Sequence, residues 1–314
     1  MTENRGIILV KSEIEKILSS LDKEIFDHKE KQYLSFGKGM RSKFAFLLGE
    51  AMGIPEEKSL ALAVCAEIVH NASLLHDDCV DAALLRRGKP TLNSVLGVNK
   101  AILLGDLSMA LAFKKAEELS CEISSQLVFS VRKMAEGALL EENFKNNIIT
   151  REQYRKMVSG KTSALFRWIS LSSAFFSKTP NFEAAAHIAE NFGMMFQITD
   201  DVIDIENCGD SGKDCLKDLM EGKCSFPLII ALEDKKFSAK NEHNIKDFFS
   251  SELKDYAMAY NLAEEIKKGG FVSAARKEAE KITEEMKNYI FTMPNSKAAS
   301  EFYAFAYGLC SRKY

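Results

Sequence analysis

Residues 67–91 read EIVHNASLLHDDCVDAALLRRGKPT, and this stretch decides how the rest of the chain is interpreted. Its apolar positions recur with a helical period until they reach Asp77, Asp78 and Asp81. On a helix, Asp77 and Asp81 lie one turn apart on the same face, with Asp78 beside them. Carboxylates this close repel one another unless a cation lies among them, and all-oxygen ligation suits Mg²⁺. The stretch therefore predicts a helix that ends in a magnesium site, with a solvated acidic helix end as the alternative.

The same aspartate spacing occurs a second time. Residues 196–204 read FQITDDVID, which places Asp200, Asp201 and Asp204 near the end of another apolar helix. Two such arrays facing each other could hold magnesium ions and a diphosphate, because Mg²⁺ shares its coordination positions with phosphate oxygens. The recurrence favours a metal–diphosphate site over two unrelated acidic helix ends.

The composition favours an all-helical chain. Its 314 residues include only 5 prolines and 17 glycines, and the long periodic stretches lack helix breakers. A formal net charge of -3 gives no reason to expect nucleic acid. The 7 cysteines are scattered and odd in number, which predicts free thiols in a reducing cytosol. No signal peptide is recognisable and no apolar run approaches the ~18 residues of a membrane span, so we expect a cytoplasmic protein without stable membrane insertion.

The two aspartate arrays resemble those of the trans-polyprenyl diphosphate synthases, the family of farnesyl, geranylgeranyl and longer-chain polyprenyl synthetases. The resemblance extends over nearly the whole chain. It implies one all-α domain, residues 1–314, built as a helical bundle of the isoprenoid synthase type around a deep central cavity, and acting as a homodimer. The implied reaction is the head-to-tail condensation of isopentenyl diphosphate with an allylic prenyl diphosphate, with Mg²⁺ as cofactor. The implied metal ligands are Asp77, Asp78, Asp81, Asp200, Asp201 and Asp204, and the implied catalytic residues are Asp77, Asp78, Asp81, Lys161, Asp200 and Asp201.

A glycine-bearing turn precedes an apolar helix near residue 43. Residues 36–42 read FGKGMRS, and backbone amides at the start of the helix could add to the attraction of Lys38 and Arg41 for a phosphate. Lys38 and Arg41 match the family motif Gly-Gly-Lys-x-x-Arg, from which Phe36 departs. The resemblance implies that both residues bind isopentenyl diphosphate.

Three further residues on either side of the first array match family positions that contact substrate. His70 lies about two turns before Asp77 on the same face, and the family's residue at that position contacts isopentenyl diphosphate. A histidine satisfied within the apolar core is the alternative. By resemblance Arg86 contacts the allylic diphosphate and Arg87 isopentenyl diphosphate, and guanidinium groups suit both.

Residues 159–167 read SGKTSALFR, and the family carries Gly-Lys-Thr here. The resemblance implies that Lys161 contacts the allylic diphosphate with Thr162 beside it, and Gly160 allows a kink or close packing. A nucleotide-binding P-loop is excluded because no strand precedes the motif and the upstream glycine is missing.

A polar loop follows the second array and resembles the family segment that closes over the diphosphates. By resemblance its residues Lys213 and Lys223 bind phosphate, and Asp218 joins the outer metal shell. Without the family resemblance, these residues would indicate only a solvated loop. On the helix before the loop, Gln197 matches a family position close to the allylic substrate.

Small side chains precede the first array. Ala72 and Ser73 stand five and four residues before Asp77, and Val69 lies one turn further back. In short-chain family members at least one of the first two positions is commonly aromatic and closes the product tunnel. We therefore expect a medium- or long-chain product, with a tunnel floor supplied by Phe113, Leu140 or Phe166. The alternative is that small residues only permit tight helix packing, which leaves a farnesyl or geranylgeranyl synthase open.

Two other classes share parts of this pattern. A class I terpene cyclase would have little use for a second cationic diphosphate site, for which Lys38, Arg41, His70 and Arg87 argue. A non-catalytic synthase subunit typically loses the aspartates, and all of them are present here.

Overall fold

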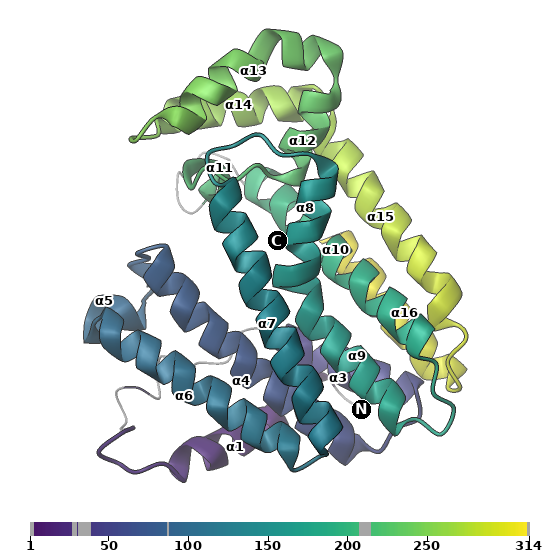
Figure 1. Ribbon diagram of the computed structural model, residues 1–314. Coiled ribbons are helices and arrows are strands. Elements are labelled where there is room, and N and C mark those ends of the chain that lie inside the picture. Colours follow the sequence, from purple (N-terminus) through teal and green to yellow (C-terminus); the bar gives the residue numbers. More distant parts are fainter. Residues whose placement is uncertain (1–2, 27–29, 31–38, 87, 207–214, 313–314) are drawn as a thin grey trace. The chain divides into compact units, whose positions relative to one another are not determined.

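The computed structural model describes residues 3–26, 30, 39–86, 88–206 and 215–312 (Figure 1). Apart from strands β1 (Leu85–Arg86) and β2 (Lys89–Pro90), which form a short antiparallel hairpin, the regular structure of these residues is helical. The prediction of an all-α fold is confirmed. Lys38, Arg87 and Lys213 lie outside the described residues.

The chain divides into two compact units, each made of several segments. Unit 1 comprises Met1–Val131, Trp168–Phe182 and Met293–Ala299, and unit 2 comprises Arg132–Arg167, Glu183–Thr292 and Ser300–Tyr314. The first aspartate array belongs to unit 1 and the second to unit 2.

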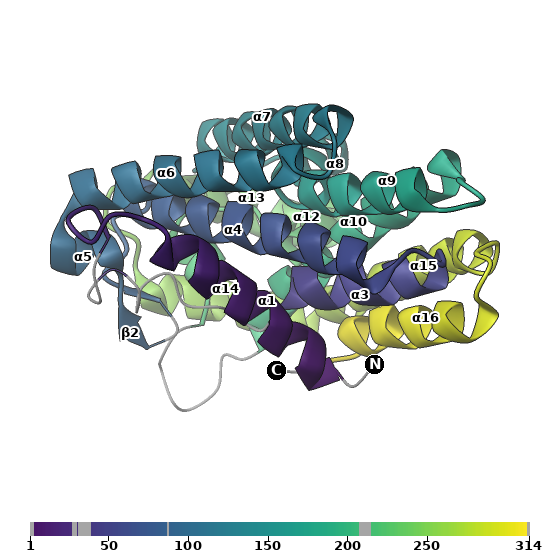
Figure 2. The ribbon, with the colours of Figure 1, turned by 90° about the horizontal axis from the view of Figure 1, so that it is seen from below.

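Unit 1 is built around one long buried helix. This helix, α4 (Glu56–Val80), packs against α1 (Glu3–Ser19), α3 (Met40–Ala51) and α6 (Val98–Glu117), and Figure 2 shows it between α6 and the α1–α3 pair. The short helix α5 (Leu92–Leu96) and the first part of α7 (Cys121–Phe144) complete the region that follows the array. Every residue from 62 to 69 on α4 is buried, which explains the near-continuous apolar sequence there.

A buried carboxylate fixes the start of α3 against α4. Glu67 accepts hydrogen bonds from the backbone N–H and the hydroxyl of Ser42, both at 2.9 Å. Burying a carboxylate is costly unless donors surround it, so this pair specifies how the two helices meet. The contact places Arg41, which precedes Ser42, at the first turn of α3.

Helix α4 also meets the length and composition of a membrane span. It contains an 18-residue window that is apolar enough, and 67% of that window is buried inside the structure. The expectation that no apolar run approaches this length is wrong, because the packing of α4 against three other helices requires a long apolar surface of its own.

Unit 2 contains the end of α7 and the helices that follow it, apart from parts of α9 and α16. They are α8 (Arg151–Val158), η1 (Ser159–Ser163), α9 (Ala164–Phe176), α10 (Phe182–Glu206), α11 (Lys217–Met220), α12 (Phe226–Glu233), α13 (Lys235–Ser250), α14 (Tyr256–Lys268), α15 (Phe271–Ile290) and α16 (Ser296–Cys310). Phe192 of α10 is fully buried and packs on Phe166 with the ring centroids 4.8 Å apart. Phe302 of α16 also packs on Phe192, with the ring centroids 6.2 Å apart.

Three glycines allow the backbones of α7, η1 and α10 to approach closely. A Cβ on Gly137 would lie 2.2 Å from the backbone nitrogen of Lys161, and one on Gly193 would lie 2.6 Å from the Cα of Ser163. A Cβ on Gly160 would meet the Cα of Gly137 at 2.9 Å, which confirms the close packing predicted for Gly160. The segment η1 is a single π-helical turn, a distortion that often occurs at functional sites.

Candidate active site

The first aspartate array divides into one buried and two half-buried carboxylates. Asp78 is 5% exposed, and its Oδ1 accepts hydrogen bonds from Nε of Arg86 at 2.8 Å and pairs with Nη2 at 2.8 Å. Asp77 and Asp81 are half-buried at the end of α4. Arg86, predicted to contact the allylic diphosphate, therefore holds a carboxylate of the array. Asp77 and Asp81 are more exposed than Asp78.

The hairpin that carries Arg86 is fixed to the end of α4 by side chains of the following segment. The hydroxyl of Thr91 donates to the carbonyl of Ala83 at 2.6 Å. The amide of Asn93 donates to the carbonyls of Asp78 and Ala83, both at 3.0 Å. These bonds tie the segment after the hairpin to the end of α4 and to the turn that follows it, so Arg86 is held in place by more than its ion pair.

His76 joins the last turn of α4 to α6. Its Nε2 lies 3.2 Å from the carbonyl of Ile102 and 3.4 Å from Oδ1 of Asp106. A Cβ on Gly105 would lie 2.2 Å from the same nitrogen, so glycine is required for this contact. The sequence suggested no role for His76, and the structure gives it a packing role. His70 is half-buried two turns earlier on α4.

The residues predicted to set product length lie in or beside the core of unit 1. Val69 and Ala72 are fully buried, and Ser73 is half-buried and donates its hydroxyl to the carbonyl of His70. Cys65, one turn before Val69 on α4, is fully buried, and burial raises the pKa of its thiol to about 12. These small side chains lie within the helix packing of unit 1, and their role in product length stays a prediction.

In the second array, Asp201 is the buried member. Asp201 is 3% exposed and accepts hydrogen bonds from the hydroxyl of Tyr154 at 2.8 Å, the backbone N–H of Phe226 at 2.8 Å and the amide of Gln197 at 3.0 Å. Burial raises the pKa of this carboxyl to about 7, although the donors lower it, and the neighbouring Asp200 raises it further. Asp201 therefore ties α8, α10 and α12 together.

Asp200 and Asp204 have different surroundings. Asp204 accepts hydrogen bonds from the backbone N–H groups of Lys217 and Asp218 at 3.0 and 3.1 Å, at the start of α11. Burial raises the pKa of Asp204 despite these bonds. The side chain of Asp200 is 62% exposed, and one of its oxygens lies 3.4 Å from Nη2 of Arg312. Nothing in the local sequence around Arg312 indicates this contact.

Lys161, predicted to contact the allylic diphosphate, and Lys223, predicted to bind phosphate, both contact a glutamate that the sequence analysis did not identify. Nζ of Lys161 forms a close ion pair with Glu141 of α7, and Nζ of Lys223 lies 3.9 Å from the same carboxylate oxygen. Lys223 also pairs with Glu221 at 2.6 Å. Burial alone would lower the pKa of Lys223, but Glu141, Asp218 and Glu221 together raise it.

A hydrogen-bonded chain connects η1 to the second array. The hydroxyl of Thr162 donates to Oε1 of Gln197 at 2.8 Å, and the amide of Gln197 donates to Asp201 at 3.0 Å. The sequence analysis placed all three residues near the allylic substrate, and the structure brings them together. Tyr154, which completes the chain, was missed because a buried tyrosine on a helix has no distinctive sequence signal.

The donor chemistry of unit 2 suits a divalent cation. Burial raises the pKa of Asp204 and of Asp218, and repulsion from neighbouring aspartates adds to the rise. Among the residues that the structure describes, no group of three or more metal-ligating side chains is arranged to hold an ion. Mg²⁺ in phosphate-handling sites commonly takes one or two carboxylates and completes its shell with water and phosphate oxygens. The residues present fit that kind of site.

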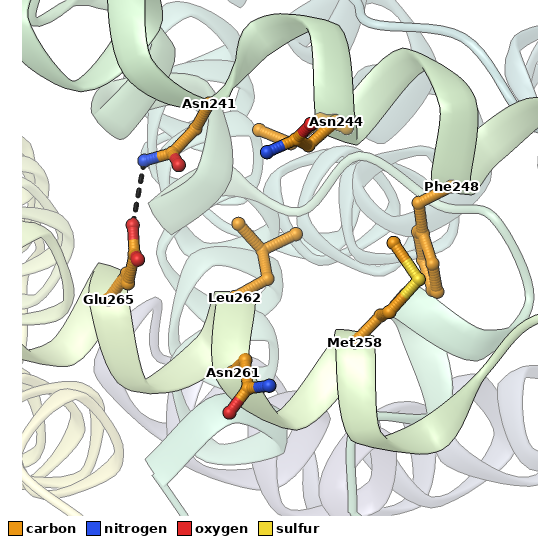
Figure 3. A pocket seen from close by; sticks show the side chains of 8 residues that line it. Asn241, Asn244, Phe248, Met258, Asn261, Leu262 and Glu265 are labelled. Atoms are coloured by element: carbon orange, nitrogen blue, oxygen red, sulfur yellow. Dashed lines mark hydrogen bonds between the residues drawn. The ribbon is translucent and has the colours of Figure 1, made fainter.

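The pocket in Figure 3 lies elsewhere in unit 2. It has a volume of about 220 Å³ between α13 and α14, with Ile245, Phe248 and Met258 among its apolar lining residues. Asn241 and Glu265 close one end through a 2.8 Å hydrogen bond. None of the residues predicted from the sequence to bind metal or substrate lines it.

The polyprenyl synthetase family model matches residues 23–266. The chain belongs to this family, and the resemblance inferred from its motifs is confirmed.

Named relatives cover different product lengths. The chain is 36% identical to an all-trans-nonaprenyl-diphosphate synthase (geranyl-diphosphate specific) of Rhodobacter capsulatus, over 63% of this chain and 62% of that protein. It is 31% identical to a geranylgeranyl pyrophosphate synthase of Geoglobus acetivorans, over 79% of this chain and 84% of that protein. The fold matches a geranylgeranyl pyrophosphate synthetase of Pyrococcus horikoshii Ot3 with a TM-score of 0.86 and 28% identity, over 98% and 96% of the two chains. The predicted isoprenoid synthase fold is confirmed.

Proposed function

We propose that this protein is a Mg²⁺-dependent trans-polyprenyl diphosphate synthase that condenses isopentenyl diphosphate head-to-tail with an allylic prenyl diphosphate. The observation that carries the proposal is the cluster in unit 2, where Lys161 and Lys223 meet beside the carboxylates of α10. Ammonium groups next to a carboxylate array match a metal-bound diphosphate, and family membership supports the same chemistry.

Each group of residues has a separate task in this proposal. Asp77, Asp81 and Asp200 are the outward carboxylates that meet Mg²⁺, while Asp78, Asp201 and Asp204 hold the surrounding backbone and side chains in place. Mg²⁺ would supply the positive charge that favours departure of the diphosphate from the allylic carbon. Lys161, Lys223 and Lys213 orient the allylic diphosphate, and Lys38, Arg41, His70 and Arg87 bind isopentenyl diphosphate. Excluding water from the reacting carbon would prevent hydrolysis of the allylic intermediate.

The first test is an assay of the purified protein with labelled isopentenyl diphosphate and farnesyl diphosphate, with Mg²⁺ or with EDTA. We expect extended prenyl diphosphates with Mg²⁺ and none with EDTA. Hydrocarbon formed from farnesyl diphosphate alone would favour a terpene cyclase, and no product with any primer would favour a non-catalytic subunit.

A medium- or long-chain product is the further expectation. The relatives include both nonaprenyl and geranylgeranyl synthases, so similarity alone does not choose between the lengths. The small residues Val69, Ala72 and Ser73 before the first array favour the longer product. Chromatography of the products from one primer measures the length directly.

The active form that we propose is a cytoplasmic homodimer in which residues 1–314 act as one domain. The support for the dimer is a set of exposed apolar side chains in unit 1, on α5, α6 and the first part of α7: Val95, Val98, Ile102, Leu103, Val128 and Phe129. Exposed apolar residues that follow consecutive helices often mark an interface between copies. Light scattering of the wild type and of Leu103→Glu tests this, since the charge should shift the mass toward the monomer.

A further inference from the structure

The contact between Lys161, Lys223 and Glu141 involves three segments that are far apart in the sequence. Glu141 lies near the end of α7, Lys161 on η1 and Lys223 in the loop between α11 and α12. The side chains are mostly buried, with exposures of 18% for Glu141 and Lys223 and 28% for Lys161. Charges in such a partly desolvated setting interact more strongly than on an open surface.

The backbone on both sides of this contact is held by packing as well as by the ion pairs. Gly137, one turn before Glu141, brings α7 against the backbone of Lys161. The backbone N–H of Asn146, just after α7, donates to the carbonyl of Gly222 at 2.7 Å, next to Lys223. A Cβ on Gly222 would lie 2.0 Å from Oδ1 of Asn146, so this docking requires glycine. The two ammonium groups are therefore brought together by the fold.

Two ammonium groups held this close repel each other, and a shared anion relieves the repulsion. In the structure the anion that both lysines share is the carboxylate of Glu141, and Lys223 also pairs with Glu221 at 2.6 Å. A diphosphate bound by the same lysines would bring its own oxygens to the same donors, because a lysine ammonium binds carboxylate and phosphate oxygens alike. The carboxylate and the diphosphate would then compete for Lys161 and Lys223.

We propose that Glu141 is a positioning residue that acts as an internal counter-anion, holding Lys161 and Lys223 together and weakening their hold on a diphosphate. The inference rests on the proposed function in taking a diphosphate as the ligand of these lysines. Such a residue limits how tightly the pyrophosphate product is retained. Product release sets the turnover rate of many enzymes, so a weaker hold favours turnover.

The test measures binding of inorganic pyrophosphate to the full chain by calorimetry in EDTA, without Mg²⁺ or prenyl substrate. Glu141→Gln keeps the size of the side chain and an oxygen acceptor but removes the charge, so we expect pyrophosphate to bind about tenfold more tightly. Glu142→Gln is the matched control. It makes the same change one residue along α7, where the side chain is 54% exposed and pairs with Lys145, and its affinity should equal that of the wild type.

A second comparison separates positioning from simple structural support. With Lys161→Gln and Lys223→Gln already in place, Glu141→Gln should change pyrophosphate affinity no more than Glu142→Gln does. If Glu141→Gln fails to fold, Glu141→Ala carries the same expectation. The proposal is overturned if neutralising Glu141 leaves affinity unchanged or weakens it, or if Glu142→Gln tightens binding equally. Because no prenyl transfer is measured, a protein without synthase activity could still support the role of Glu141, and an active synthase could refute it.

Discussion

The closest backbone approach described around the candidate site involves Gly137, and replacing it with alanine should damage that site without altering any charged residue. The added Cβ would lie 2.2 Å from the nitrogen of Lys161, 2.7 Å from the carbonyl carbon of Gly160 and 2.9 Å from the Cα of Lys161. All three atoms are backbone, so no side-chain rotation relieves the clash. To restore carbon contacts of about 3.5–4.0 Å, α7 and η1 must separate by roughly 1 Å.

The expected cost follows from that displacement. Overpacking of a well-packed interior typically costs about 1–3 kcal/mol of unfolding free energy. Alanine has the higher helix propensity, which offsets up to about 1 kcal/mol of this cost. A shift of about 1 Å at Lys161 relative to the substrate would lower turnover by about 10²-fold. We therefore expect Gly137→Ala to be less stable and much less active.

Urea unfolding followed by circular dichroism measures the stability, and turnover with farnesyl and isopentenyl diphosphates measures the activity. Gly308→Ala is the matched control, because Gly308 lies inside helix α16 and a Cβ there meets no atom within 4 Å. That change should be neutral or stabilising by up to about 1 kcal/mol. A Gly137→Ala protein with the unfolding midpoint and turnover of the wild type would refute the close packing of α7 on η1.

Four further substitutions test the two arrays and the product tunnel. Asp77→Ala should lower turnover by about 10³-fold with stability unchanged. Asp78→Ala should also lower the free energy of unfolding by about 1–3 kcal/mol, because it leaves Arg86 without its carboxylate. Near-normal turnover of Asp77→Ala at saturating Mg²⁺ would contradict the metal site. Tyr154→Phe removes one donor from buried Asp201 and should cost about 1–3 kcal/mol, and an unchanged urea midpoint would show that the bond contributes nothing. Ala72→Phe should shorten the products while the first condensation persists. Product chromatography from one primer measures this. A wild type that stops at geranylgeranyl diphosphate, or a variant whose products are unchanged, would contradict the proposed tunnel.

The helices and both aspartate arrays could be predicted because helical periodicity is local. The apolar spacing before Asp77 and before Asp200 indicates a helix without knowledge of any partner. The same geometry also separates adjacent residues by about 100° around the helix axis, so two neighbouring aspartates cannot face the same way. The sequence analysis listed both aspartates of each pair as metal ligands, and the structure buries one of each pair, Asp78 and Asp201. Their role as ligands stays a prediction.

The contacts made by Glu141 and Tyr154 could not be predicted, because their partners are distant in sequence. Glu141 meets Lys161 across 20 residues, and Tyr154 meets Asp201 across 47 residues. Neither residue has a motif of its own, and each acts only through the packing of α7 or α8 on its neighbours. The lysines could be identified from the family resemblance, but the carboxylate that pairs with them depends on tertiary structure.

The two arrays share one arrangement of buried and exposed aspartates. In each, one of two adjacent aspartates is buried and satisfied by protein donors: Asp78 by Arg86, and Asp201 by Tyr154, Gln197 and a backbone amide. Those donors offset the cost of burying the charge, and the backbone they fix determines where the outward carboxylates lie. Asp77 and Asp200 are more exposed, and we propose that they are the members that meet the cation. The inward aspartate thus gives the outward one a fixed position, and substitutions should separate accordingly: changes at Asp78 or Asp201 should lower stability first, and changes at Asp77 or Asp200 should raise the Mg²⁺ requirement first.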